Sequence, residues 1–245
     1  MKALILAAGY ATRLYPLTEN QPKPLLKIAG KPIIDHIIDK IAALSDVNEI
    51  FIVTNARFYQ NFKEWSDSFS GSKKITLIND GTLTKEDRLG AIGDINFVLK
   101  DQSVDEDLLV IGGDNLFEEE LPVFHEFFRK ADGSVLTLYD VKDLEQAKLF
   151  NNLTLDKDQK ILQFEEKPLN PTSTLIATLI YFLKKEHLQL LPQAINNGFA
   201  DRAGDFIKYL SQRKPVYGLP LRGRWFDIGS FKALTEAEEF YQKKL

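Results

Sequence analysis

Apolar residues along this chain form short continuous runs, separated by segments in which they recur every three or four positions. Runs of the first kind occur near 3–7, 49–54 and 107–112. Continuous apolar runs are typical of buried parallel strands, whereas isoleucines spaced as they are from 33 to 41 indicate a helix. The pattern predicts strands at 3–7, 49–54, 74–78, 107–112 and 134–139, and helices at 32–41, 57–65, 91–99 and 121–130.

The pattern changes after about residue 140. Three β-like stretches follow, at 153–155, 161–165 and 175–183, with turn residues at 156–160 that predict a hairpin. The remaining elements are predicted as helices at 184–195, 204–213 and 231–244, and a strand at 216–219. Strands alternating with helices predict an α/β fold with a Rossmann-like, mainly parallel mixed sheet and helices on both faces. We expect a single domain over 1–245, with lobes at about 1–140 and 141–230 and a C-terminal helix at 231–244.

Composition excludes several classes of function. The 245 residues are 44% hydrophobic and 27% charged, which allows a sizeable core, and the net charge of −4 with no basic stripe argues against a nucleic-acid partner. The chain has no cysteine, which excludes disulfides, thiolate nucleophiles and cysteine zinc sites and suits a cytoplasmic location. The first apolar run is too short for a signal peptide, and no segment is long enough to span a membrane. Homo-oligomers are common among enzymes, so a homo-oligomer is possible, but the sequence identifies no interface patch.

The loop after the first predicted strand reads Leu-Ala-Ala-Gly-Tyr-Ala-Thr-Arg-Leu over 6–14. Small residues there let backbone N–H groups approach an anion, and Arg13 adds a planar fork of donors suited to phosphate. Ligands of open α/β sheets bind beyond the C-terminal ends of the strands, where this loop lies. Lys23 stands between two prolines, which stiffen the backbone that presents its charge. These residues alone also allow a second interpretation, in which the loop is an ordinary surface turn and both Arg13 and Lys23 are solvated.

Two aspartates follow or precede predicted elements. Asp114 comes directly after the strand at 107–112, and Asp227 comes just before the last helix. Mg²⁺ prefers a few carboxylates together with water and phosphate oxygens, so the two could share one ion. Taken singly, each also suits a helix cap or a turn. The histidines are scattered and form no metal motif; they are His36, His125 and His187.

Five separated motifs together resemble the sugar-1-phosphate nucleotidyltransferases, of the glucose-1-phosphate thymidylyltransferase type. They are Leu-Ala-Ala-Gly-x-x-Thr-Arg-Leu from residue 6, Pro-Lys-Pro-Leu-Leu from 22, Gly-Asp-Asn from 113, Glu-Glu-Lys-Pro from 165 and Trp-x-Asp-x-Gly from 225. The resemblance covers nearly the whole chain and implies the nucleotide-diphospho-sugar transferase fold, without an appended repeat domain. It implies transfer of a nucleoside monophosphate from a nucleoside triphosphate, dTTP or UTP being favoured, to a sugar 1-phosphate, with release of pyrophosphate.

The resemblance also implies roles for individual residues, with Mg²⁺ as cofactor and the nucleoside triphosphate and a small phosphorylated acceptor as partners. Arg13 and Lys23 are the implied catalytic residues, and Asp114 and Asp227 are the implied ligands of Mg²⁺ on the α-phosphate. Lys167 is expected to meet the acceptor phosphate and Glu166 the sugar hydroxyls. The implied nucleotide-binding residues are Leu6, Ala7, Ala8, Gly9, Tyr10, Ala11, Thr12, Asn79, Asp80, Gly81 and Gly90. The implied acceptor-binding residues are Asn115, Asn151, Glu166, Lys167, Thr178, Asp205 (expected just before a helix) and Trp225.

The chain departs from the family pattern at the acceptor. Ala11 replaces the usual second glycine of the first loop, and two further glycines that normally admit the sugar ring are replaced by Asn151 and Leu179. These departures keep two alternatives open. One is a CTP-dependent cytidylyltransferase for a phospho-alcohol such as phosphocholine, and the other is a catalytically silent nucleotide-binding subunit.

Overall fold

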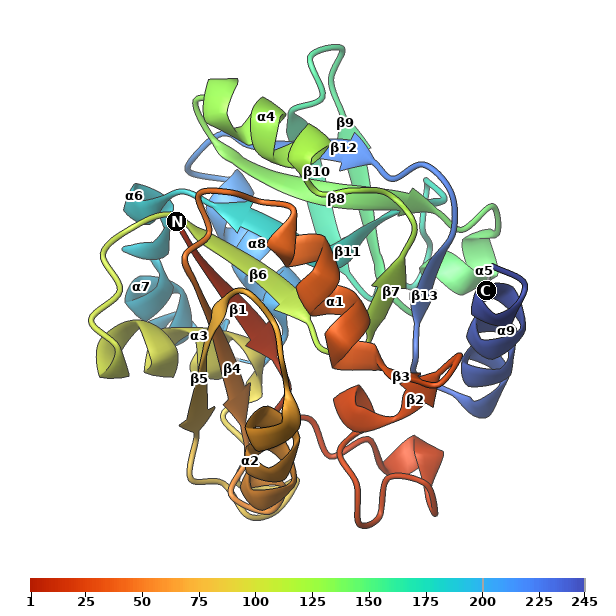
Figure 1. The fold of residues 1–245 in the computed structure, drawn as a ribbon. Coiled ribbons are helices and arrows are strands. Elements are labelled where there is room, and N and C mark those ends of the chain that lie inside the picture. The colour runs from red at the N-terminus through yellow and green to blue at the C-terminus, as the bar shows by residue number, and fades with distance from the viewer. Residues whose placement is uncertain (200, 245) are drawn as a thin grey trace. The chain divides into compact units, whose positions relative to one another are not determined.

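The structure is a computed structural model that describes residues 1–199 and 201–244 (Figure 1). The chain divides into two compact units. The N-terminal unit comprises Lys2–Arg88, Ile111–Leu121 and Gly223–Leu245, and the central unit comprises Met1, Leu89–Val110 and Pro122–Arg222. No helix in the described part of the chain combines the length and the apolar character needed to cross a bilayer.

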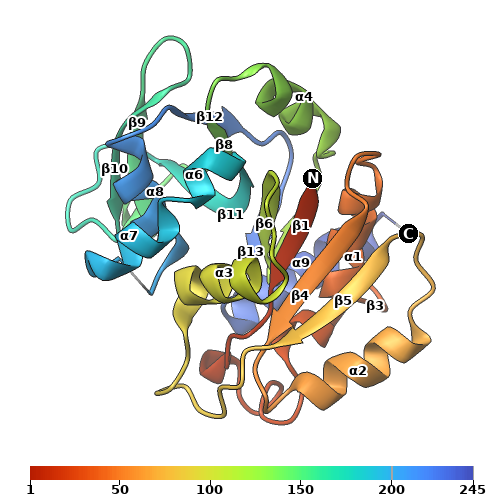
Figure 2. The same cartoon turned by 90° about the vertical axis from the view of Figure 1, so that its left-hand side faces the viewer.

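Three parallel strands form the sheet of the N-terminal unit: β1 (Lys2–Leu6), β4 (Glu49–Thr54) and β5 (Lys74–Asn79). They lie side by side in Figure 2, with β4 between the other two. The apolar run of β1 is fully buried at its centre, as the absence of polar positions there predicts. Because the strands are parallel, the loops that follow them all leave from the same edge of the sheet.

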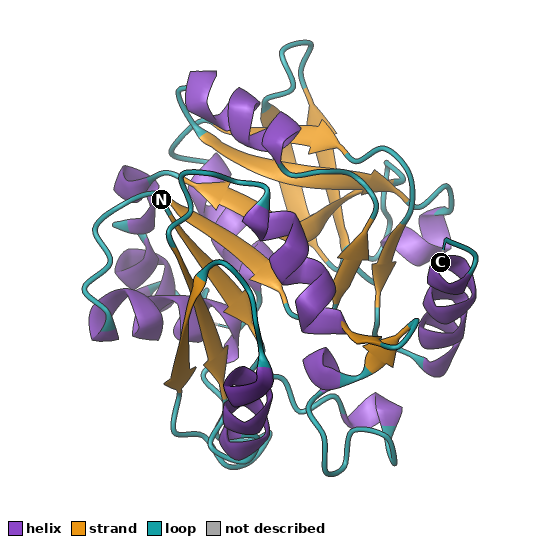
Figure 3. Cartoon of the chain, in the orientation of Figure 1, coloured by secondary structure: helices purple, strands orange, loops and turns teal. Residues whose placement is uncertain are grey.

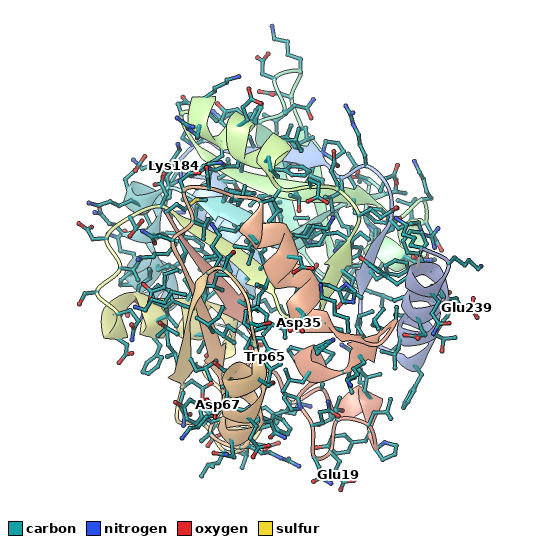
Figure 4. All side chains as sticks on the ribbon, in the orientation of Figure 1. Glu19, Asp35, Trp65, Asp67, Lys184 and Glu239 are labelled. Carbon is teal, nitrogen blue, oxygen red and sulfur yellow. The ribbon has the colours of Figure 1, made fainter. Side chains whose placement is uncertain are left out.

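Helices α1 (Ile33–Ala42) and α2 (Tyr59–Ser68) belong to the same unit. The isoleucine stripe of α1 is buried, and the indole Nε1 of Trp65 on α2 donates a hydrogen bond of 2.8 Å to Asp35 Oδ1 on α1 (Figure 4). The helix was expected to begin at Pro32, but Pro32 ends the short hairpin of β2 (Lys27–Ile28) and β3 (Lys31–Pro32). Short 3₁₀ turns cover Thr12–Leu14 and Lys23–Leu25.

A second, two-stranded sheet in the N-terminal unit was not predicted. It pairs β7 (Asn115–Phe117) with β13 (Trp225–Asp227) in antiparallel register, Asp227 opposite Asn115. Each strand has only three residues, too few for a periodic signal. Its pairing brings the end of β6 (Leu108–Gly112) close to the start of α9 (Phe231–Gln242), the helix that Ser230 caps through Ala233 N.

The central unit contains the antiparallel pair β8 (Ser134–Asp140) and β11 (Leu175–Leu183), with β12 (Val216–Pro220) parallel to β8 (Figure 3). The predicted hairpin is present as β9 (Asn151–Leu155) and β10 (Ile161–Glu166). The unit's longer helices are α3 (Gly90–Asp101), α4 (Pro122–Lys130) and α8 (Ala203–Ser211). A mixed, mainly parallel sheet with helices confirms the predicted fold class.

Three boundaries in the central unit differ from prediction. The helix expected at 184–195 is divided into α6 (Lys185–Leu188) and α7 (Leu191–Asn196), because Pro192 cannot donate to a preceding carbonyl and starts a new helix instead. A short helix, α5 (Leu144–Ala147), was missed. The helix predicted at 204–213 runs over Ala203–Ser211 as α8, and Asp205, which the resemblance places just before a helix, lies in its first turn, where its carboxylate accepts from Arg202 N.

Candidate active site

The loop after β1 holds its backbone amides open to a ligand. The N–H groups of Gly9, Tyr10 and Ala11 donate no hydrogen bond to any residue that the structure describes. The carbonyl groups of the loop, in contrast, are held by side chains. The buried Asn55 amide donates to Ala8 O (2.9 Å), and Thr18 Oγ1 donates to Ala11 O (2.8 Å). Successive unpaired N–H groups beside a fixed backbone form a concave anion site.

Ala11 adopts the conformation for which a glycine is usual. Its φ of +46° lies in the left-handed region, where a Cβ is disfavoured by roughly 1–2 kcal/mol. The carbonyl of Ala11 still accepts from Leu14 N at 3.0 Å, which closes the first 3₁₀ turn. The substitution of alanine for glycine therefore keeps the turn that presents Arg13.

This loop lines a cleft of about 360 Å³ within the N-terminal unit. The predicted catalytic residues Arg13 and Lys23 line it, together with Asp114. A Cβ on Gly113 would lie 2.8 Å from Leu6 O and 3.0 Å from Pro24 Cγ, so a glycine is needed at this wall. The full lining is Leu6, Ala7, Gly9, Tyr10, Ala11, Thr12, Arg13, Lys23, Pro24, Lys85, Arg88, Gly113 and Asp114.

Lys23 reaches Asp114 across the cleft. Its Nζ lies 2.5 Å from Asp114 Oδ2. Pro22 is extended (φ −68°, ψ 142°), and the 3₁₀ turn that begins at Lys23 is fixed by Gln21 Nε2 donating to Leu25 O. Prolines on both sides restrict the backbone, so the ammonium group is presented in one direction.

Asp114 and Asp227 form a close pair of carboxyl groups with opposite electrostatics. Burial raises the pKa of Asp227 above its ordinary value, and the negative charge of Asp114 raises it further. Burial acts in the same sense on Asp114, but the ammonium of Lys23 outweighs it and holds the pKa of Asp114 below its ordinary value. Asp114 is therefore the ionised member of the pair, and a cation between the two would relieve their repulsion.

The β7–β13 pairing orients this carboxyl pair. Asn115 is buried, its Oδ1 accepts from Trp225 Nε1 (2.7 Å), and its Nδ2 donates to Asp114 Oδ1 (3.1 Å). Ile228 N donates to Asp114 O at 3.0 Å, beside Asp227. Asn115 and Trp225, which the sequence suggested for the acceptor, thus contact the aspartate side of the cleft in this structure.

The segment after β5 is joined to the first loop through Thr82. Asp80 Oδ1 accepts from both Thr82 N (2.7 Å) and Thr82 Oγ1 (2.8 Å), and Thr82 Oγ1 lies 3.1 Å from the hydroxyl of Tyr10. Gly81 has φ +82° and donates to Asn79 Oδ1. Ala8 and the predicted nucleotide-binding residues 79–81 are thus placed beside the cleft without lining it.

Gly90, the remaining predicted nucleotide-binding residue, belongs to the central unit, where it begins α3. Its φ is +77°, and a Cβ would lie 2.8 Å from Asp201 O. Ala91 N donates to the same carbonyl at 2.8 Å. The glycine is therefore explained within this unit by close backbone packing.

Glu166, Lys167 and Asp205 come together in the central unit. Burial raises the pKa of Glu166 to about 7, and the neighbouring Asp205 contributes in the same direction. Gly204 permits this packing, because a Cβ there would meet Glu166 Oε2 at 1.9 Å. Lys167 is exposed, has φ +48° and donates its N–H to Phe150 O at 2.9 Å.

Asn151 and Thr178 use their polar atoms within the fold. Asn151 Nδ2 donates to Ala177 O (3.0 Å), and Asn151 Oδ1 accepts from Ala177 N (2.7 Å). The hydroxyl of Thr178 contacts Thr137 Oγ1 and donates to Thr137 O at 3.2 Å. Both side chains are buried, so in this conformation they fasten β11 to its neighbours.

A family model described as Nucleotidyl transferase matches residues 2–244 of the chain. The chain belongs to this family. A Bifunctional protein GlmU from Methanocaldococcus jannaschii is 35% identical over 246 residues, covering all of this chain and 55% of the relative. A putative mannose-1-phosphate guanyltransferase from Sulfolobus acidocaldarius is 29% identical over 232 residues, covering 94% of this chain and 60% of the relative. The chain spans little more than half the length of these curated relatives.

Solved structures share the fold. A putative glucose-1-phosphate thymidylyltransferase from Bacillus anthracis, in complex with a sucrose, superposes with a TM-score of 0.84 at 24% identity over 99% of this chain and 95% of that one. A UDP-glucose pyrophosphorylase complexed with UDP-glucose also gives 0.84, at 22% identity over 100% and 99% of the two chains. At these identities the likeness establishes the fold of the nucleotidyl transferase. Its chemistry has to be argued from its own residues.

The carboxyl pair of this nucleotidyl transferase offers oxygen donors for a divalent cation. The part of the chain that the structure describes holds no group of three or more acidic, histidine or cysteine ligands. Mg²⁺ is commonly bound through one or two carboxylates with water and substrate phosphates completing its shell. The pair Asp114 and Asp227, with Asp114 ionised, fits that donor set.

Sequence reasoning missed part of the cleft wall. Lys85 lines the cleft, yet it lies in a stretch that no family motif aligns. Pro24 and Gly113 line it as well, and both stand inside motifs, so their neighbours could have indicated them. Asn55, which holds the first loop through Ala8 O, could have been indicated by its position. It directly follows β4, at the same edge of the sheet as the first loop.

Proposed function

We propose that this nucleotidyl transferase joins a nucleoside monophosphate from a nucleoside triphosphate to a sugar 1-phosphate, forms an NDP-sugar and releases pyrophosphate. The observation that carries the proposal is the contact of 2.5 Å between Lys23 and Asp114 in a cleft that Arg13 also lines. Cations, open backbone amides and the carboxylate of Asp114 in one cleft, with Asp227 beside it, suit a phosphoryl group and its counterion.

The proposed reaction is a direct displacement. An oxygen of the acceptor phosphate attacks the α-phosphorus in line, a new P–O bond forms, and the bond to the β-phosphate oxygen breaks with its electron pair leaving on pyrophosphate. Lys23 neutralises charge at the α-phosphate, and Arg13 stabilises the leaving phosphates. Asp114 and Asp227 would hold Mg²⁺, which would supply further positive charge to the phosphate oxygens. The protein thus acts through positioning and electrostatics, with no covalent intermediate.

A sugar is the favoured acceptor because the central unit offers a half-buried carboxyl group, Glu166, beside a second one, Asp205. Carboxyl oxygens accept hydrogen bonds from neighbouring hydroxyls, and Lys167 next to Glu166 carries the charge for an acceptor phosphate. Three of the relatives and structures named above carry sugar names: mannose-1-phosphate, glucose-1-phosphate and UDP-glucose. Asn151 stands where the family usually has a glycine that admits the sugar ring, and its buried amide is bonded to Ala177. This difference keeps a phospho-alcohol acceptor as the second candidate.

For the nucleobase we propose uracil or thymine, so that UTP or dTTP is the donor. The names of similar proteins include thymidylyl, UDP and guanyl specificities, which makes GTP the direct competitor. The backbone of 79–81 offers a polar edge held in place by Asp80 and Tyr10, which suits recognition of a small pyrimidine.

The test is pyrophosphate release with Mg²⁺ over a matrix of the five common nucleoside triphosphates against sugar 1-phosphates and phospho-alcohols. We expect release with UTP or dTTP and one sugar 1-phosphate, and loss of release in Lys23→Met. Lys27→Met is the matched control, since Lys27 is exposed and does not line the cleft. Release only with CTP and a phospho-alcohol would move the protein to the second candidate. Silence throughout, with nucleotide binding retained, would overturn catalysis and leave a binding subunit.

A further inference from the structure

Two buried side chains outside the cleft direct polar atoms at the loop that follows β1. Asn55, which directly follows β4, and Thr18 are both fully buried, and neither lines the cleft. Asn55 Nδ2 donates to Ala8 O at 2.9 Å, and Thr18 Oγ1 donates to Ala11 O at 2.8 Å. Two carbonyl groups of the loop are thus held by residues that belong to the protein interior.

The planarity of the peptide bond turns these carbonyl contacts into a direction for the next amide. The Ala8–Gly9 and Ala11–Thr12 peptides are both trans. In a planar trans peptide the C=O and the N–H point in opposite directions, so a carbonyl directed into the interior directs the following N–H the other way. Gly9 and Thr12 line the cleft, and neither N–H has a hydrogen-bond acceptor among the residues that the structure describes.

The side-chain amide of Asn55 is held in a single orientation. Its Oδ1 accepts from Phe58 N at 3.0 Å, while its Nδ2 donates to Ala8 O. Turning the amide over would set its oxygen against the oxygen of Ala8 and its NH₂ group against the N–H of Phe58. Asn55 therefore offers only a donor to Ala8, and this donor fixes the direction of the peptide that follows.

The connection between β4 and α2, residues 55–58, supports the second contact as well. Arg57 Nη2 donates to Glu19 O at 2.6 Å, directly after Thr18 in the chain. Asn55 itself lies 47 positions after Ala8, outside the motif of the first loop. The direction of the loop amides is therefore set by a distant segment of the N-terminal unit.

We propose that Asn55 and Thr18 are positioning residues, which aim the N–H groups of Gly9 and Thr12 at the oxygens of a phosphate group in the cleft. They hold the loop in this conformation before a ligand arrives, so binding requires little rearrangement. The assignment rests on the proposed function for its meaning in the reaction, but anion binding itself can be measured without turnover. Because backbone amides make the contact, it requires a phosphate and does not depend on the nucleobase.

Position 18 allows the hydroxyl to be removed with little change in shape. Thr18→Val keeps the branched side chain, and Ala11 O retains Leu14 N as a donor at 3.0 Å, so we expect this variant to fold. Inorganic pyrophosphate, titrated by calorimetry into the full chain with Mg²⁺ present, should bind Thr18→Val about 3- to 10-fold more weakly than the wild type. Thr18→Ser keeps the hydroxyl and should bind within about twofold of the wild type.

The matched control for position 18 is Thr76→Val on β5. It removes a hydroxyl that donates to Glu49 Oε1 at 2.7 Å, and Thr76 does not line the cleft. The control should bind pyrophosphate within about twofold of the wild type, because it loses a similar hydrogen bond that has no connection to the loop.

Asn55→Ala is the stronger test, because Ala8 O then loses its donor. We expect pyrophosphate binding to weaken at least about 10-fold. Thermal unfolding followed by circular dichroism defines the range in which the variant is folded, and the comparison is made there. In that range pyrophosphate should protect amides 8–14 from hydrogen exchange in the wild type and much less in the variant, whereas exchange in β5 should be equal in both. If Asn55→Ala does not fold, the Thr18 variants decide.

Three results would overturn the assignment. Pyrophosphate could bind Thr18→Val as tightly as the wild type, or it could bind folded Asn55→Ala as tightly. Thr18→Ser could also bind as weakly as Thr18→Val, which would assign the effect to packing at this position and not to the hydroxyl. Failure of the proposed function looks different. In that case pyrophosphate binding still depends on Asn55 and Thr18, while the substrate matrix gives no transfer.

Discussion

Asp114 has three different neighbours that act on its carboxylate. Lys23 attracts it with a full charge, Asn115 donates an amide hydrogen bond, and Asp227 repels it unless a proton or a cation lies between them. Such an arrangement fixes the orientation of the ionised group and leaves part of its coordination for a ligand.

Replacing Asp114 with asparagine keeps the shape of the side chain and removes its charge. We expect Asp114→Asn to lower kcat at least about 100-fold, since Mg²⁺ and Lys23 both lose their anionic partner. Pyrophosphate release with the substrates identified in the matrix measures the effect. Asp67→Asn, at an exposed position on α2 (Figure 4), is the control and should retain full activity. A wild-type kcat in Asp114→Asn would contradict the metal and lysine assignments together.

Glu166 gives a prediction about pH and stability. Its pKa is raised from 4.5 to about 7 by burial and by Asp205, so the folded state binds the proton more tightly than the unfolded state does. The stabilisation by protonation is fully present below pH 4.5 and is lost as pH rises through about 7, by at most about 3 kcal/mol. Urea unfolding of the wild type and Glu166→Gln at pH 5 and pH 8 tests this. The variant should lose little stability over that interval compared with the wild type, and parallel pH profiles would refute the shift.

Sequence could indicate individual residues only where a local motif surrounds them. Arg13, Lys23 and Asp114 follow strands or stand between prolines, and all three line the cleft. The support that Trp225 gives to Asn115 joins residues 110 positions apart, and no local pattern contains such a pairing. Lys85 stands in a polar stretch without periodicity, so nothing in the sequence distinguished it from a solvated lysine.

At the scale of elements, two asparagines link β9 to β11 and to the segment that precedes β11. Asn151 forms two hydrogen bonds with the backbone of Ala177. Asn152 Nδ2 donates to Ser173 O, and its Oδ1 accepts from Thr172 N and Oγ1, each at 3.0 Å. Asn151, which the sequence suggested as a loss from the acceptor pocket, is therefore a structural link between strands.

Asn151→Ala should remove both hydrogen bonds and leave the buried N–H and C=O of Ala177 without these partners. We expect a loss of about 1–3 kcal/mol in the free energy of unfolding, measured by urea denaturation. Asn151→Gly, which restores the family's usual residue, should be destabilised at least as much, because it also increases backbone freedom in the unfolded chain. Asn170→Ala, at an exposed position in the same unit, serves as the control. A glycine variant as stable as the wild type would show that the amide links contribute nothing.

Elements with a strong period were predictable, and those without one were not. The parallel strand β4 was predicted with its observed bounds, because its apolar run is bounded by polar residues on both sides. Strands β7 and β13 were missed, since three residues pair only after distant parts of the chain meet. These missed strands orient Asp114 and Asp227, so the least predictable element carries the predicted metal ligands.

At the scale of the whole molecule, the residues that line the cleft belong to a different unit from Glu166 and Lys167, which are proposed for the acceptor. The cleft with Arg13, Lys23 and Asp114 is built entirely by the N-terminal unit, whereas Glu166 and Lys167 belong to the central unit. Two ligands can therefore be followed separately through the backbone amides that each one protects. The amides of Gly9–Ala11, which have no partner among the described residues, provide the sharpest reporter.

Hydrogen exchange measured by mass spectrometry turns this division into a prediction. Inorganic pyrophosphate with Mg²⁺ should slow exchange in 8–14, because a bound anion accepts from amides that otherwise exchange with solvent. A sugar 1-phosphate that serves as substrate should instead slow exchange in 164–168. Arg13→Ala is the control for the first effect, and it should abolish protection of 8–14 while leaving the second effect in place. Protection of 164–168 by pyrophosphate, with none in 8–14, would reverse the assignment of the two units to the two halves of the reaction.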